Sequence, residues 1–174
     1  MQPKRGVLIL ECLNKSDPGS EGLCLSHMFN LMKIPNQYLE IQTLYQFVSL
    51  MKCSPYEIIH ITTHGSKVKE QFEGFWTKKG ILTKDKLHYL KNKLKGYSVV
   101  TTACSSGDDD FRESFEDVTS CKYFVAPTKD VRFYNSIFFC NIFYYYLFIR
   151  KKEIPKILDF YDTRFKNPHE FDYL

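Results

Sequence analysis

The sequence predicts an α/β fold, a three-layer sandwich with a mainly parallel central sheet flanked by helices. Short apolar runs rich in β-branched residues, typical of buried parallel strands, alternate along the chain with segments of helical periodicity. Turn-forming residues lie between these segments. The chain has 174 residues, of which 44% are hydrophobic, so it is long enough for one well-buried core. We therefore expect a single domain spanning 1–174.

The first half of the chain predicts three strands and two helices. The strands are expected at 6–13, 38–43 and 56–63, and the helices at about 23–34 and 44–53. Turn residues at 14–22 precede the first helix, and Pro35 is expected to stop it. The stretch 66–83 mixes Gly, Lys and aromatic residues, which favours a surface hairpin or a long loop.

The second half continues the alternation. Thr83 is a plausible N-cap for a helix over 84–95, with Leu87, Leu90 and Leu94 on one face and Gly96 at its end. Two further strands are expected at 97–104 and 122–127, separated by a loop or short helix at 105–117. A largely buried helix over 136–154 is expected to precede a polar tail.

Composition excludes several classes of protein. The net charge is +4, with 24 basic and 20 acidic residues spread along the chain, so we expect no nucleic-acid partner. The most apolar stretch, 138–149, is shorter than the roughly 20 residues that a membrane span needs. The six cysteines show no paired spacing, which indicates free thiols in a reducing compartment. We therefore expect a soluble, cytoplasmic protein without a membrane span.

Two strand endings carry reactive side chains. His64 and Gly65 close the run YEIIHITTHG, and Cys104 closes YSVVTTAC. Because the carboxyl ends of parallel strands meet at one edge of a sheet, both side chains are expected at one site. A thiolate is the attacking form of cysteine, and a neighbouring imidazole withdraws its proton. The hypothesis is a cysteine peptidase with Cys104 and His64 as its dyad.

The same residues resemble a known family. IIHITTHG (58–65) and SVVTTACSSG (98–107) resemble the strand-plus-HG and strand-plus-AC motifs of caspase-like (clan CD) cysteine peptidases. The likeness is greatest to the CHAT branch, which also carries a histidine at the position of His60. The segments 80–100 and 124–148 are similar to those of that branch as well. Ser-Ser-Gly after Cys104 departs from the acidic residue and Thr often found there.

The resemblance implies a caspase-like sandwich in which Cys104 is the nucleophile and His64 the general base. The backbone N–H groups of Gly65 and Cys104 would form the oxyanion hole, and neither a third triad residue nor a cofactor is required. The partners implied are a protein substrate and a regulatory or activating protein. By analogy the activity would serve bacterial antiphage defence or regulated cell death, for example by cleaving a gasdermin-like effector.

Two other functions remain open. The first is a catalytically silent caspase-like domain that binds a partner through the same cleft. The second is a zinc-dependent hydrolase built on His60 and His64. On a strand these residues share a face, and His60 is expected to support the site structurally, with no metal bound. His27, His88 and His169 show no partner in the sequence and are expected at the surface or in packing.

The acidic run Asp108, Asp109 and Asp110 follows Cys104 closely and has three readings. Carboxylates in a substrate pocket would favour Arg or Lys before the scissile bond. A run of like charges is also typical of a solvated loop. A loop beside an active site can also act as a self-cleavage or activation segment.

Overall fold

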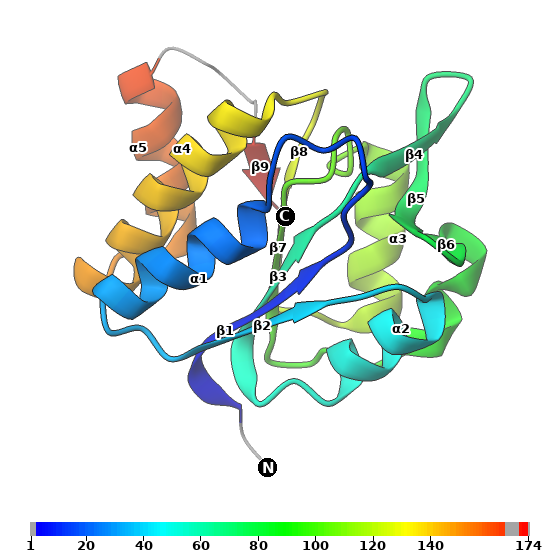
Figure 1. Ribbon diagram of the computed structural model, residues 1–174, viewed down its shortest axis with the longest axis horizontal. Helices are drawn as coiled ribbons and strands as arrows, with labels where there is room; N and C mark the ends of the chain where they lie inside the picture. The colour runs from blue at the N-terminus through cyan, green and yellow to red at the C-terminus, as the bar shows by residue number, and fades with distance from the viewer. Residues whose placement is uncertain (1–2, 166–170, 174) are drawn as a thin grey trace.

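The computed structural model describes residues 3–165 and 171–173 and has a six-stranded central sheet in the order β2-β1-β3-β7-β8-β9 (Figure 1). The strands are β1 (Lys4–Glu11), β2 (Asn36–Glu40), β3 (Tyr56–Thr62), β7 (Ser98–Thr101), β8 (Tyr123–Pro127) and β9 (Phe171–Tyr173). All pair in parallel except β9, which runs antiparallel to β8. The predicted α/β fold with a mainly parallel sheet is confirmed.

Helices cover both faces of this sheet, which gives three layers (Figure 1). One face carries α1 (Glu21–Leu31), α4 (Phe133–Tyr144) and α5 (Ile154–Phe165). The other carries α2 (Leu44–Lys52), the 3₁₀-helix η1 (Lys84–Leu90) and α3 (Asp109–Thr119). A small antiparallel sheet of β4 (Gly65–Val68), β5 (Gln71–Thr77) and β6 (Gly80–Thr83) packs on this second side.

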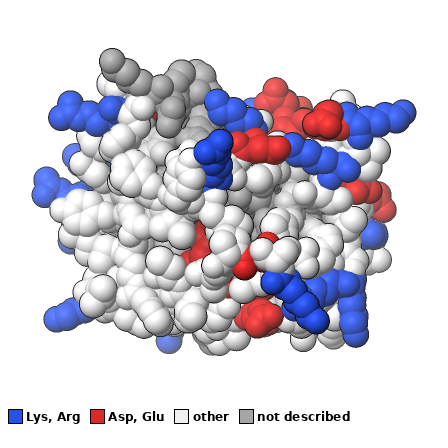
Figure 2. Space-filling view, turned by 45° about the horizontal axis from the view of Figure 1, so that its top comes forward, with Lys and Arg blue, Asp and Glu red and all other residues white. Residues whose placement is uncertain are grey.

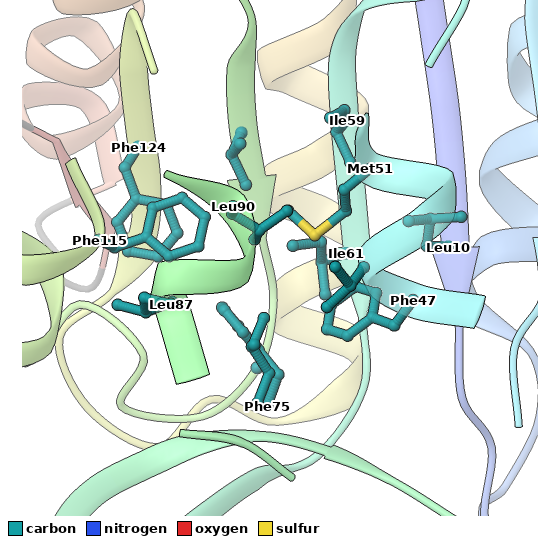
Figure 3. Packing of buried hydrophobic residues seen from close by; sticks show 14 of the residues in the cluster. Leu10, Phe47, Met51, Ile59, Ile61, Phe75, Leu87, Leu90, Phe115 and Phe124 are labelled. Atoms are coloured by element: carbon teal, nitrogen blue, oxygen red, sulfur yellow. The ribbon is translucent and has the colours of Figure 1, made fainter. Parts of the chain in front are cut away.

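The core is split by the sheet into two clusters. In β1, Val7 and Ile9 pack toward α1 and α4, whereas Leu8 and Leu10 pack toward α2. This alternation is expected when both faces of a parallel sheet are covered. Figure 3 shows the cluster that contains Leu10, in which side chains from α2, η1, α3 and β5 contact those of the sheet.

Helix boundaries follow local chemistry. Helix α2 starts at the capping box of Thr43 and Gln46, close to the predicted boundary. Ser20 caps α1 by accepting the N–H of Leu23. Helix α1 ends at Leu31, before Pro35, because Lys33 adopts a left-handed conformation with φ 56°. The prediction that Pro35 stops this helix is therefore wrong.

The predicted helix over 84–95 is wrong in type and length, although Leu87, Leu90 and Leu94 are buried on one side as expected. The segment is a 3₁₀-helix that ends at Leu90, and the Thr83 hydroxyl bonds the Asp85 carboxylate instead of capping the backbone. Beyond Leu90 the chain turns, and the N–H groups of two residues donate to carbonyls at the end of α3. These bonds are Asn92 to Val118 (2.8 Å) and Leu94 to Thr119 (3.0 Å).

Two other segments differ from expectation. Residues 66–83 lie in the three-stranded antiparallel sheet. The predicted hairpin is therefore present, but it is extended by a third strand. The long buried helix is interrupted after Tyr144 by a π-helical turn, η2 (Tyr145–Ile149), and by Lys151 at φ 51°. Helix α5 then follows where a polar tail was expected, because four apolar positions spaced along one face bury it. Those positions are Ile154, Ile157, Leu158 and Tyr161.

The surface shows no continuous basic patch on the face seen in Figure 2, where Lys and Arg lie mostly toward the periphery with Asp and Glu among them. No helix in the described part of the chain is long and apolar enough to span a membrane. All six cysteines are free. His27 and His88 are exposed, whereas His169 lies outside the described residues.

Phe75 of β5 is fully buried, and its ring packs against several other phenylalanine rings. The centroid distances are 5.9 Å to Phe47, 5.5 Å to Phe72, 5.5 Å to Phe111, 6.3 Å to Phe115 and 6.4 Å to Phe124. Phe75→Ala is expected to lower the free energy of unfolding by about 3–5 kcal/mol, measured by urea denaturation. Tyr45→Ala, at a position 82% exposed, should change it by less than about 0.5 kcal/mol. Equal effects of the two substitutions would contradict this packing.

Candidate active site

A small cavity of about 40 Å³ lies at the carboxyl edge of the parallel strands β1, β3 and β7. It is lined by residues from the ends of these strands and the segments that follow them, from the first turns of α1 and α4, and from the loop that precedes α4. The lining residues are Cys12, Leu13, Asp17, Glu21, Thr62, Thr63, His64, Thr102, Cys104, Val131, Phe133 and Ser136. The structure thus brings His64 and Cys104, 40 residues apart in the sequence, to one cavity.

His64 follows the end of β3 and is held on two sides. Its Nε2 lies 2.9 Å and 3.1 Å from the two carboxylate oxygens of Asp17. Its ring also packs edge-on against Trp76, with centroids 6.0 Å apart. Because Asp17 engages Nε2, a proton exchanged with any other group would have to pass through Nδ1. The imidazole is 43% exposed, so solvent can reach it.

Asp17 is a site residue that sequence reasoning missed. Its side chain is only 8% exposed, and it also accepts the N–H of Asn14 at 2.6 Å. In the sequence it lies among the turn residues between the first strand and the first helix. The signal that would have found it is its position: the loop after β1 lies at the same sheet edge as the loop after the neighbouring β3.

Cys104 occupies a tight turn after β7. The N–H of Ser106 donates to the carbonyl of Ala103 at 3.1 Å, and Ser105 between them takes a left-handed φ of 58°. A residue other than glycine in this conformation is uncommon and is held there only by its surroundings. The half-buried Cys104 thiol donates to the carbonyl of Val131 at 3.5 Å.

The loop 128–132 is fastened beside this turn. The N–H of Ser105 donates to the carbonyl of Lys129 at 3.1 Å, and its hydroxyl donates to Asp130 at 2.8 Å. Asp130 also bonds Lys67 of β4. The hydrogen bond from Lys67 lowers the pKa of Asp130, and the same bond raises the pKa of Lys67. These bonds hold Val131 against the thiol.

Gly65 packs directly on the backbone of Cys104. A Cβ at this position would lie 2.2 Å from the Cys104 carbonyl oxygen, so no side chain fits. The carbonyl of Cys104 therefore occupies the space that the missing side chain leaves. The N–H of Trp76 donates to the His64 carbonyl at 3.1 Å, and the next pair along the ladder is Gly65 and Phe75. The alternation of antiparallel ladders therefore directs the Gly65 N–H away from β5.

A buried polar network lies beneath the cavity. Glu21, at the start of α1, accepts the hydroxyls of Thr102 (2.7 Å) and Ser136 (2.8 Å), and lies 3.4 Å from Nε2 of His60. Nδ1 of His60 lies 2.8 Å from the hydroxyl of Tyr144. His60 is fully buried and Glu21 is 3% exposed. His60 thus bonds the scaffold under the site and does not reach His64 through any of these bonds.

The arrangement does not favour a zinc site on His60 and His64, because the two imidazoles are held by different carboxylates. In the described part of the chain, one group of potential ligand atoms lies within 4.8 Å of one another, and it comprises Glu21, His60 and Cys140. This group does not include His64. Burial raises the pKa of Cys140 well above its usual value, which keeps it a neutral thiol.

Asp108, Asp109 and Asp110 do not line the cavity. Asp109 and Asp110 lie in the first turn of α3 with side chains 82% and 78% exposed, paired with Arg112 and Lys84 respectively. Asp108 is the residue before that helix. Their positions fit the solvated reading, since acidic residues are favoured at helix N-termini. The pocket reading has no geometric support.

Comparison with known proteins adds no family to these observations. No protein-family model matches the chain, and no curated protein matches it significantly.

The Gly65 contact predicts a steep cost for any side chain at this position. Gly65→Ala is expected to lower the free energy of unfolding by about 1–3 kcal/mol, because the clash is with backbone that cannot rotate away. Gly19→Ala is the control, since a Cβ there meets nothing within 4 Å. Thermal unfolding of both variants measures the difference. A Gly65→Ala protein as stable as Gly19→Ala would contradict the contact.

Proposed function

We propose that the chain is a caspase-like cysteine endopeptidase that cleaves protein substrates with Cys104 as nucleophile and His64 as general base. The observation that carries the proposal is the shared cavity of Cys104 and His64, with Asp17 holding the far nitrogen of the imidazole. The resemblance of the two motifs to caspase-like peptidases, greatest to the CHAT branch, supports the same reading. By that analogy the substrate is one or a few partner proteins in antiphage defence or regulated cell death.

The chemistry follows from the residues present. Nδ1 of His64 takes the proton of the Cys104 thiol, and the sulfur attacks the carbonyl carbon of the scissile peptide bond. The resulting oxyanion is stabilised by backbone N–H groups, for which Gly65 and Cys104 are proposed. His64 then gives its proton to the departing amine, and a thioester remains. Water hydrolyses the thioester, which releases the acid product and restores the thiol.

Asp17 is proposed as the residue that orients His64. A carboxylate on Nε2 fixes the tautomer and stabilises the imidazolium that forms when Cys104 loses its proton. The Asp17 side chain is nearly buried, so the interaction is screened little by solvent. Asp17 would therefore act through His64 and not on the substrate.

One observation favours the alternative of a silent, partner-binding domain. The Cys104 thiol donates to the Val131 carbonyl at 3.5 Å, and the loop that carries Val131 is fastened by Asp130. A peptidase requires that this thiol turn to the substrate. The two functions are separated by the reactivity of Cys104 toward a substrate-like electrophile.

Labelling by a peptidyl acyloxymethyl ketone is the test. In this reaction the Cys104 sulfur displaces the carboxylate of the probe and forms a thioether. We expect labelling of the wild type and none of Cys104→Ala, as measured by intact mass. Cys12→Ala is the matched control, because Cys12 lines the same cavity but burial raises its pKa. Labelling that depends on Cys12, or an unreactive Cys104 in folded protein, would favour the binding domain.

Asp17→Ala is expected to lower kcat/KM for a cleaved substrate by about 10- to 1000-fold, less than or equal to the loss in His64→Ala. The fall should be in kcat, because the imidazole loses the carboxylate that orients it and balances its charge. Asp109→Ala removes a carboxylate outside the cavity and should leave both constants unchanged. An unchanged kcat in Asp17→Ala would remove Asp17 from the mechanism.

A further inference from the structure

We infer that Glu21 makes this site selective for substrates with a cationic side chain, Lys or Arg, immediately before the scissile bond. The inference rests on the proposed function, because it assigns a substrate class to the same cavity. One of the three interpretations of the acidic run placed such selectivity in Asp108, Asp109 and Asp110, which do not line the cavity. Glu21 is at the start of α1, more than 80 residues before the nucleophile in the sequence.

The charges around the cavity have one sign. Of the described residues that line it, Asp17 and Glu21 carry carboxylates, and none is Lys or Arg. A substrate aspartate would therefore meet two acids and no cation, and like charges at close range oppose binding. A substrate ammonium or guanidinium would instead meet an acidic surface. The cavity thus favours a cation.

Between the two acids, Glu21 is the one available to a substrate. Both oxygens of Asp17 lie within 3.1 Å of the His64 imidazole, and Asp17 also accepts the Asn14 N–H. Glu21 accepts the hydroxyls of Thr102 and Ser136, and its imidazole neighbour, Nε2 of His60, is farther away at 3.4 Å. A carboxylate has about four lone-pair sites and can accept further donors.

The hydrogen bonds of Glu21 also connect it to the two segments that flank Cys104 in space. Thr102, which bonds Oε1, lies two residues before Cys104, and Ser136 follows the loop that carries Val131. Because Glu21 and Cys104 line the same small cavity, we expect the side chain of the residue that donates the scissile carbonyl to extend toward Glu21. The cavity volume of about 40 Å³ is enough for a few water molecules. It therefore suits the end of an unbranched substrate side chain better than an aromatic ring.

Four acyloxymethyl ketone probes that differ only in the residue next to the ketone test the inference: lysine, arginine, norleucine and aspartate. Norleucine has the same four-carbon side chain as lysine but lacks the terminal ammonium. We expect the lysine or arginine probe to label Cys104 on the order of 100-fold faster than the norleucine probe, and aspartate to be slowest. The rate of labelling is measured by intact mass, with Cys104→Ala as the blank.

Glu21→Gln removes the charge and preserves the hydrogen bonds. The Ser136 hydroxyl lies 2.8 Å from the Phe133 carbonyl as well as from Glu21, so it can donate to Phe133 and accept from the new amide. The Thr102 hydroxyl can still donate to the amide oxygen. In this variant the lysine and norleucine probes should react within about 3-fold of each other. Glu21→Asp, which retains the charge, should retain a preference for lysine.

Asp109→Asn is the matched control, because it removes one negative charge outside the cavity and should leave the preference intact. Circular dichroism establishes that each variant is folded. If the norleucine and lysine probes label the wild type equally fast, or Glu21→Gln keeps the full preference for lysine, the proposed selectivity is wrong. The proposed peptidase activity is still supported in that case, because Cys104 reacts. If no probe labels folded wild type through Cys104, the proposed function fails and the selectivity with it.

Discussion

The site depends on one buried carboxylate. Burying the charge of Glu21 is costly unless donors surround it, and its donors come from elements far apart in the sequence. Thr102 comes from the segment after β7, and Ser136 comes from α4. His60, 3.4 Å away, belongs to β3. Satisfying this carboxylate therefore requires that the strands carrying Cys104 and His64 end together, with α1 and α4 above them.

A second buried carboxylate sets the loop that supplies Asp17. Glu11 ends β1 fully buried and accepts the Gly22 N–H and the Tyr38 hydroxyl, each at 2.7 Å. Burial raises the pKa of Tyr38 to about 12, so this donor keeps its proton. Glu11 thereby joins the start of α1 to β1 and β2. The chain between Glu11 and Gly22 is closed into a short loop, which brings Asp17 over the end of β3 to His64.

The sequence predicted the layers and the placement of His64 and Cys104 at one sheet edge, but it did not predict the buried carboxylates. The strands that precede His64 and Cys104 are mostly buried and rich in Ile and Val, and the topology of parallel sheets brings their ends to one edge. Asp17 and Glu21 follow turn and N-cap residues, where acids are ordinarily solvated. Their burial arises only from contacts between distant elements, which local patterns do not contain. The same reason explains why the predicted α-helix over 84–95 is not formed: backbone N–H groups after Leu90 donate to carbonyls at the end of α3.

The double role of Glu21 limits how the charge of the cavity can change. A neutral apolar residue would leave the buried Thr102 hydroxyl without its acceptor, at a cost of about 1–3 kcal/mol, whereas the Ser136 hydroxyl could still donate to the Phe133 carbonyl. A basic residue would likewise offer Thr102 no acceptor. Only a side chain with an acceptor at the same position, such as Glu or Gln, preserves the joint between the strands. The scaffold therefore requires an acceptor at this position, and the carboxylate of Glu21 adds the negative charge on which the proposed selectivity for a cation rests.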